Sequence, residues 1–131
     1  MHKSAALFAL FLGIAQASTA PTLPEVRLNP EEVAARLTQA GNQIGSSALP
    51  GVRTSVLYGD PSKEGFYTIL IYVPAHTVVQ AHSHRDNRMA AVLSGSWRFG
   101  YGTDFNESAL KKMPPGSVYS EPRNEPFRAD R

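Results

Sequence analysis

The chain has 131 residues and a formal net charge of +2, with 42% hydrophobic and 18% charged residues. This length suits one domain rather than two, and the composition is that of a folded globular protein rather than a disordered one. The near-neutral charge argues against a nucleic-acid partner, and the absence of cysteine excludes disulfides, thiolate catalysis and zinc–thiolate sites.

Residues 1–20 have the pattern of a signal peptide. Lys3 gives a short basic start, residues 5–15 are apolar, and small residues then lead to Ala17 and Ala20. Signal peptides have these parts in this order, and the apolar run is too short to span a membrane comfortably. The sequence therefore predicts a periplasmic or secreted protein that keeps no membrane segment after cleavage.

Residues 21–48 are predicted to form a linker followed by a short helix. Asn29 is a suitable helix N-cap, because Pro30 suits the first helical position and Glu32 lies three residues after the cap. Gly41 would end the helix, and a loop would follow. A helix this short gains little stability by itself, so we expect it to dock on the main domain.

Residues 49–131 are predicted to form an all-β domain. Short segments with strand character are separated by turn residues at intervals of about 8–12 residues, which favours an antiparallel barrel or jelly roll. The expected strands are 52–58, 66–73, 77–84, 89–93, 96–101 and 118–120. Residues 106–112 are expected to form one or two helical turns.

His82 and His84 are the first candidate site. Residues i and i+2 of a strand point to the same face, so these imidazoles would project side by side from roots about 7 Å apart. Such a pair can converge on one ion or one ligand. Because an isolated pair of this kind often only faces water, the surrounding sequence carries the argument.

The spacing around these histidines resembles the two motifs of the cupin superfamily. The first motif runs Gly, five residues, His-x-His, three or four residues, Glu, six residues, Gly; here its last position is Gly95. The second motif runs Gly, five residues, Pro-x-Gly, two residues, His. Its spacing is held here by Gly116, Pro122 and Phe127. The resemblance covers about residues 49–127 and implies a cupin-like jelly-roll barrel.

Four motif positions carry other residues. His76 and Asn124 stand in place of glycines, Arg88 in place of the glutamate, and Phe127 in place of the second motif's histidine.

In cupins the two histidines of the first motif, the glutamate and the later histidine hold a divalent metal. By this resemblance His82 and His84 would be ligands of a divalent transition metal. Only two of the four ligands remain, however, and Arg88 would bring a positive charge toward the ion unless it points outward or pairs with Asp86. Substitute ligands, all outside the motif positions, would be His76, Asp86 and Glu121.

A second use of the same residues is the binding of an anionic small molecule. Arg88 offers a planar guanidinium that matches a carboxylate, to which His82 and His84 would add hydrogen-bond donors. A solvated strand end is an equal alternative for Arg88. An apolar ligand pocket beside it would be lined by three aromatic residues that alternate onto one strand face, Trp97, Phe99 and Tyr101. For at least two of these three, a place in the barrel core is the stronger alternative.

The sequence after the second motif is short. In cupins further strand follows this motif and closes the barrel, whereas this sequence continues for four residues, Arg128 to Arg131, of polar character. We therefore expect a barrel incomplete at its C-terminus, whose open edge favours a homodimer unless residues 24–48 cover it.

Three functions remain open at this stage. The first is an exported cupin-like domain that binds a small molecule in its pocket, with or without a divalent metal. The second is a metal-dependent cupin enzyme of the oxygenase or isomerase type, and the third is an incomplete cupin without activity.

Overall fold

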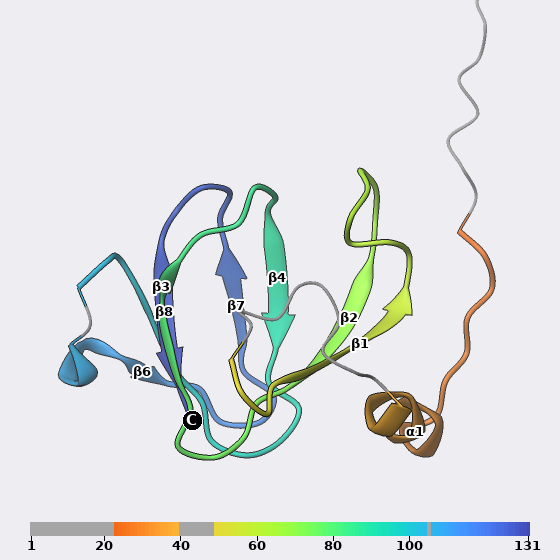
Figure 1. The fold of residues 1–131 in the computed structure, drawn as a ribbon, viewed down its shortest axis with the longest axis horizontal. Helices are drawn as coiled ribbons and strands as arrows, with labels where there is room; N and C mark the ends of the chain where they lie inside the picture. Colours follow the sequence, from red (N-terminus) through yellow and green to blue (C-terminus); the bar gives the residue numbers. More distant parts are fainter. Residues whose placement is uncertain (1–22, 40–48, 105) are drawn as a thin grey trace, which may run out of the picture.

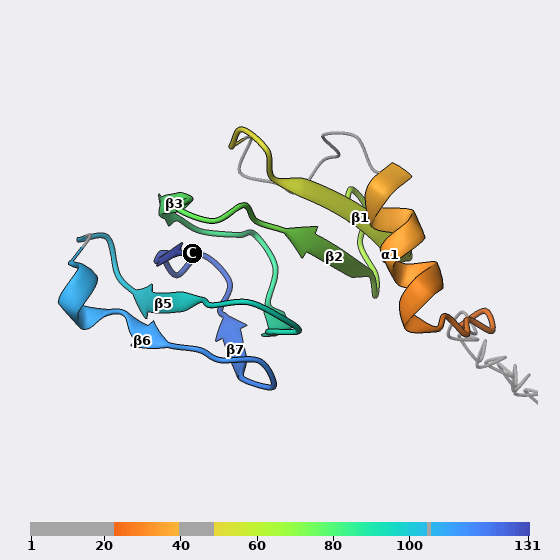
Figure 2. The same ribbon diagram turned by 90° about the horizontal axis from the view of Figure 1, so that it is seen from below.

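The computed structural model describes residues 23–39, 49–104 and 106–131, whose arrangement is shown in Figures 1 and 2. The predicted signal peptide, helix terminator and following loop lie outside these residues. No helix in the described ranges is long and apolar enough to cross a membrane.

The described chain contains one α-helix, one 3-10 turn and eight short strands. In chain order they are α1 (Pro30–Gln39), β1 (Arg53–Tyr58), β2 (Thr68–Tyr72), β3 (Val78–His82), β4 (Arg88–Ala91), β5 (Arg98–Tyr101), η1 (Glu107–Ala109), β6 (Lys111–Lys112), β7 (Val118–Glu121) and β8 (Phe127–Asp130).

Helix α1 begins where the sequence predicts. The Glu32 backbone N–H donates to Asn29 Oδ1 at 2.9 Å, and the Asn29 backbone N–H donates to Glu32 Oε2 at 2.7 Å. This reciprocal capping box satisfies two backbone donors at the helix start. Arg36 Nη1 donates to the Leu57 carbonyl at 3.1 Å, so the helix docks on the β1–β2 sheet, as Figure 2 shows.

The strands pair antiparallel into three separate sheets. Strands β1 and β2 form one pair, β4 and β7 form another, and the largest sheet has the order β3-β8-β5-β6. The predicted all-β class with one short helix is therefore confirmed. The strands of the described residues do not close into a barrel.

The chain after Phe127 differs from the prediction. Residues 127–130 are not a polar tail but strand β8, which lies between β3 and β5 in the four-stranded sheet. All four residues are buried. Phe127 and Ala129 face the core, whereas Arg128 and Asp130 find polar partners on the other face. The open edge expected at this point is therefore absent from the described residues.

A second difference lies in residues 106–112. Only Glu107–Ala109 forms a helical turn, capped by the Asn106 side chain, which accepts a hydrogen bond from the Ser108 backbone N–H at 3.0 Å. Lys111 and Lys112 then form strand β6 at the edge of the largest sheet. Exposed lysines are a common protection of a sheet edge against pairing with another chain.

The core lies against the inner face of the four-stranded sheet. Its buried members are Val79, Phe99, Met113, Phe127 and Ala129, and half-buried side chains of Leu49, Val92, Trp97 and Tyr119 pack around them. The Phe99 ring stacks on Phe127, with centroids 5.3 Å apart. Two adjacent strands, β5 and β8, thus supply the aromatic centre of the domain.

Candidate functional site

A β-bulge in β3 decides which way the histidines point. Val79 pairs with Ala129 and His82 pairs with Phe127, so two residues of β3 stand opposite Arg128 alone. Without the extra residue His82 would lie on the face opposite Val79, because side chains alternate along a strand. The bulge reverses this alternation and turns His82 toward the inner face.

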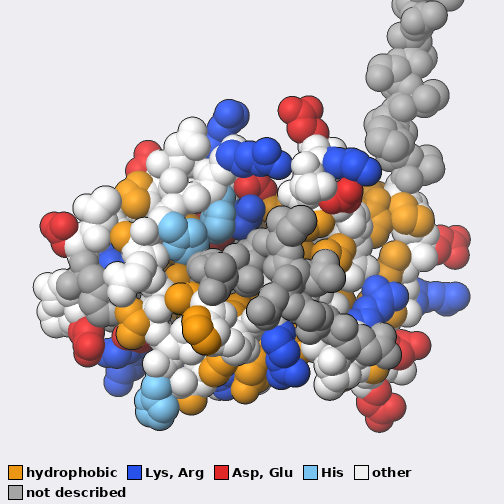
Figure 3. Space-filling model, in the orientation of Figure 1, with side chains coloured by type: hydrophobic (Ala, Val, Ile, Leu, Met, Phe, Trp, Pro, Cys, Tyr) orange, Lys and Arg blue, Asp and Glu red, His pale blue; other side chains and the backbone are white. Residues whose placement is uncertain are grey.

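His82, His84 and Phe127 meet on this inner face. The two histidines are the predicted metal ligands, and Phe127 stands where the second cupin motif has its histidine. The His82 and His84 ring centroids are 5.0 Å apart, and they lie 4.4 and 5.3 Å from the Phe127 centroid. Two neighbouring histidine side chains are visible in Figure 3, with basic and acidic side chains close to them. We call His82, His84, Glu121 and Phe127 the histidine face.

His82 is oriented by its own strand. Its Nδ1 lies 2.9 Å from the Gln80 carbonyl oxygen, which can only accept a hydrogen bond. Nδ1 therefore carries the proton that it donates, and in the neutral ring the lone pair lies on Nε2. The bulge thus sets the direction of this side chain, and the Gln80 carbonyl sets its tautomer.

His84 contacts a carboxyl group that comes from strand β7. Its Nε2 lies 3.3 Å from Glu121 Oε2, and the exposed fractions of the two side chains are 17% and 13%. Burial, with contributions from Arg88 and His82, lowers the pKa of His84 to about 4, and burial raises the pKa of Glu121. The imidazole is therefore neutral at neutral pH, so this contact is not an ion pair although its distance would suit one.

Arg88 is engaged away from the histidine rings. Its Nε and Nη2 donate to the Asp86 carboxylate at 3.0–3.2 Å. Tyr67 Oη also donates to Asp86, and burial raises the pKa of this tyrosine. Although burial acts in the opposite direction, the hydrogen bonds from Arg88 and Tyr67 lower the pKa of Asp86. The guanidinium predicted to capture an anion thus already holds a carboxylate of its own chain.

Glu121 is the residue of this face that the motif comparison leaves out. Arg88, in the place of the motif's glutamate, pairs directly with Glu121 across the β4–β7 ladder. A carboxyl group is therefore present beside His84, but the neighbouring strand supplies it. The sequence signal for it is only the position of Glu121 within the second motif's spacing, directly before Pro122.

The three predicted aromatic residues do not line one pocket on the histidine face. Phe99 is 4% exposed and belongs to the core, where it contacts Tyr119 at a centroid distance of 4.3 Å and Tyr101 at 5.1 Å. Tyr101 is 53% exposed, and its hydroxyl donates to the Ser120 carbonyl at 2.9 Å. Trp97 packs against the core and lines a cavity that is described below.

The glycine positions of the two motifs all have a backbone with positive φ. Gly95 and Gly116 have φ angles of 78° and 87°. His76 and Asn124, which stand where the cupin motifs have glycine, have φ angles of 61° and 60° and are the two non-glycine residues with positive φ in the described chain. This left-handed region favours glycine. The motif positions therefore keep a conformation suited to glycine even where the residue is different.

The candidate metal ligands are brought together only in part. Within the described ranges, no group of three or more His, Asp or Glu side chains is arranged to hold one. His76 is exposed in the turn before β3, and Asp86 is occupied by Arg88 and Tyr67. The apolar ring of Phe127 takes the place of a further ligand beside His82.

Comparisons with known proteins add no family to this description: no family model, curated protein or solved structure matched the chain.

Proposed function

We propose that this chain is an exported, cupin-like domain that binds a small molecule at the histidine face. The observation that carries the proposal is the bulge in β3, which turns two histidines onto an aromatic ring beside a half-buried carboxyl group. A bulge that re-aims side chains is a recurrent feature of functional sites in sheets. Export rests on the N-terminal pattern alone.

The cupin-like character is supported by the backbone rather than by the side chains. The two motifs together have glycine at four positions, which are residues 76, 95, 116 and 124 in this chain. All four of these residues have positive φ. His82 also stands directly opposite the residue in the place of the last motif histidine. A jelly roll formed from these strands is part of the proposal.

The chemistry of the histidine face favours an uncharged ligand that has a hydroxyl group. His82 offers an acceptor at Nε2, since Nδ1 is used by Gln80. His84 is neutral at neutral pH, and the cation nearest to it, Arg88, is neutralised by Asp86. The Phe127 ring is 4% exposed and packs against both imidazoles from the core side, so it holds the two rings in place rather than contacting the ligand.

The metal-dependent enzyme is the weaker proposal. Two imidazoles and one carboxyl group leave coordination positions unfilled. We therefore expect a divalent transition metal to bind weakly. An incomplete, inactive cupin remains the third hypothesis.

The test is a titration followed by the NMR signals of the imidazole rings. Phenol serves as the uncharged probe, acetate as the anionic probe and Zn²⁺ as the metal probe. We expect phenol to shift the His82 and His84 signals saturably, and His82→Ala to abolish the effect. His76→Ala, a histidine variant in an exposed turn, is the matched control and should change nothing.

The three probes separate the hypotheses. A response to acetate alone would replace the proposal by anion capture, and tight binding of one Zn²⁺ per chain would restore the metal-dependent enzyme. No saturable response to any probe, in a protein that unfolds cooperatively, would favour the inactive domain and overturn the proposal.

A further inference from the structure

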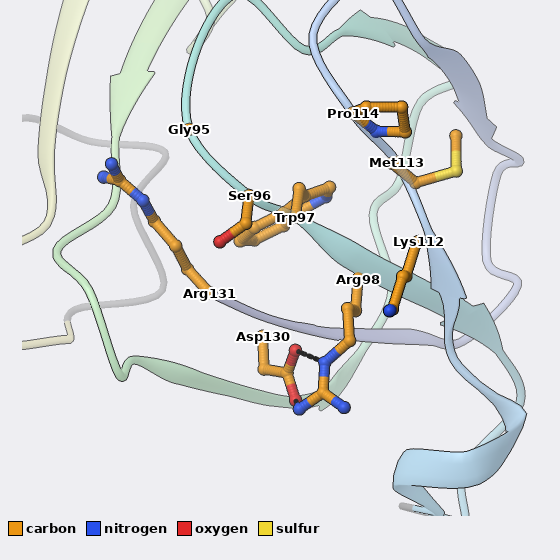
Figure 4. A pocket seen from close by; sticks show the side chains of 9 residues that line it. All are labelled: Gly95, Ser96, Trp97, Arg98, Lys112, Met113, Pro114, Asp130 and Arg131. Carbon is orange, nitrogen blue, oxygen red and sulfur yellow. Dashed lines mark hydrogen bonds and ion pairs between the residues drawn. The ribbon is translucent and has the colours of Figure 1, made fainter.

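A cavity of about 390 Å³ lies at the end of β8 opposite the histidine face. Phe127 at one end of β8 contacts the histidines, whereas Asp130 at the other end lines the cavity. The remaining walls come from residues 95–97 with the first residue of β5, and from the last residue of β6 with the two residues after it (Figure 4). Its volume is within the range of about 300–1,000 Å³ that is usual for small-molecule sites.

The apolar wall of the cavity is held in place by the core. Trp97 and Met113 both line the cavity and pack within or against the core cluster. The Met113 backbone N–H donates to the Trp97 carbonyl at 2.7 Å, which ties the two residues together. The indole therefore presents a pre-positioned flat surface to any molecule in the cavity.

The polar wall carries an excess of basic groups. Arg98 forms two hydrogen bonds with Asp130, at 2.7 and 2.6 Å, and also lies 3.5 Å from Glu107. Lys112 stands directly opposite Arg98 in the β5–β6 ladder. Like charges directly opposite each other destabilise a sheet.

The Lys112 side chain lines the cavity and forms no ion pair among the described residues. Arg131 donates to the Val73 carbonyl, lies over the Tyr72 ring at 5.4 Å and flanks Gly95, on the far side of Trp97 from Lys112 (Figure 4). An anion in the cavity would relieve the repulsion between Lys112 and Arg98.

We propose that this cavity binds a small aromatic carboxylate. The ring would lie against the Trp97 indole, and the carboxylate would pair with the Lys112 ammonium group, while Arg98 stays bound to Asp130. The site is separate from the histidine face, so the two proposals succeed or fail independently.

Intrinsic fluorescence tests the proposal directly, because Trp97 is the single tryptophan of the chain. Benzoate is the probe, benzyl alcohol is the neutral control of similar shape, and acetate is the anion without a ring. We expect saturable quenching by benzoate that weakens with added salt, with much weaker effects of the other two. His82→Ala should leave benzoate binding unchanged.

A matched pair of variants tests whether Lys112 supplies the positive charge that binds the carboxylate. Lys112→Gln should weaken benzoate binding about fivefold, which is the upper range for a partly exposed ion pair. Lys111→Gln removes the neighbouring exposed lysine of the same strand, which does not line the cavity, and should have no effect. Lys112→Arg should keep the binding, which separates a loss of charge from a loss of folding. Equal binding of benzoate and benzyl alcohol, equal effects of the two Gln variants, or absence of saturation would each overturn the proposal.

Discussion

His76 occupies a backbone position at which a glycine is favoured, with φ of 61°. We expect His76→Gly to stabilise the protein by about 0.5–1 kcal/mol, because relief of about 1–2 kcal/mol of left-handed strain exceeds the added freedom of the unfolded chain. Ala75→Gly, one residue earlier in the same turn, is the control and should destabilise by about 0.5–1 kcal/mol. Urea unfolding measures both. If both variants destabilise equally, the strain at His76 is not significant.

The burial of His84 and of Glu121 predicts opposite effects of pH for the two groups. With a folded-state pKa of about 4 against 6.5 unfolded, His84 lowers the free energy of unfolding as pH falls from above 6.5 toward 4, by up to about 3 kcal/mol. The pKa of Glu121 is raised above 4.5, so its contribution to stability is present at low pH and is lost as pH rises through the folded-state pKa.

The two groups can be separated by substitution. Relative to the parent protein, His84→Gln should gain stability on acidification from pH 7 to 4.5, and Glu121→Gln should lose it more steeply. Denaturant unfolding at several pH values in this range is the measurement. Changes of the same sign in both variants would show that the burial of these two groups does not set the pH dependence.

At the scale of single elements, the sequence predicts most strands and the helix cap. It misses strand β8, which depends on pairing with strands distant in the sequence. Asn29 and Glu32 are a local signal and form the expected capping box. Strand β8 is missed because four residues are too few for a periodic signal, and the charges of Arg128 and Asp130 suggest exposure. Their partners, the Tyr101 carbonyl and Arg98, lie about thirty positions earlier in the chain and become neighbours only in the folded sheet.

The candidate site was predictable to a similar extent. The spacing of His82 and His84 is visible in the sequence, and the structure places both on one face. The engagement of Arg88 by Asp86 was one of two alternatives that the sequence left open. The approach of Glu121 to His84 depends on the register between β4 and β7, and the direction of the histidines depends on a bulge. Neither feature has a signature in one short stretch of sequence.

At the scale of the whole molecule, the outer face of the β4–β7 pair is the surface at which we expect weak self-association. Met89 and Val118 on this face are 73% and 63% exposed, and Leu93 just beyond β4 is 69% exposed. In the described residues β4 and β7 pair only with each other, and a formal charge of +2 gives little repulsion between copies.

Sedimentation velocity over a wide range of protein concentration tests this expectation. The parent protein should show a concentration-dependent dimer, and Val118→Lys should be monomeric. Ile71→Lys, at a 44% exposed position in the β1–β2 sheet, should dimerise like the parent. A parent protein that stays monomeric throughout, or an Ile71→Lys variant that loses the dimer, would rule out this surface.

The central place of β8 also has a consequence for the order of events during biosynthesis. Of the strands in the four-stranded sheet, β8 leaves the ribosome last, yet it separates β3 from β5. Until it arrives, its two neighbours have no hydrogen-bonding partner between them, and the Phe99 ring has no Phe127 to stack on. The largest sheet and its aromatic core therefore cannot form until β8 has been synthesised.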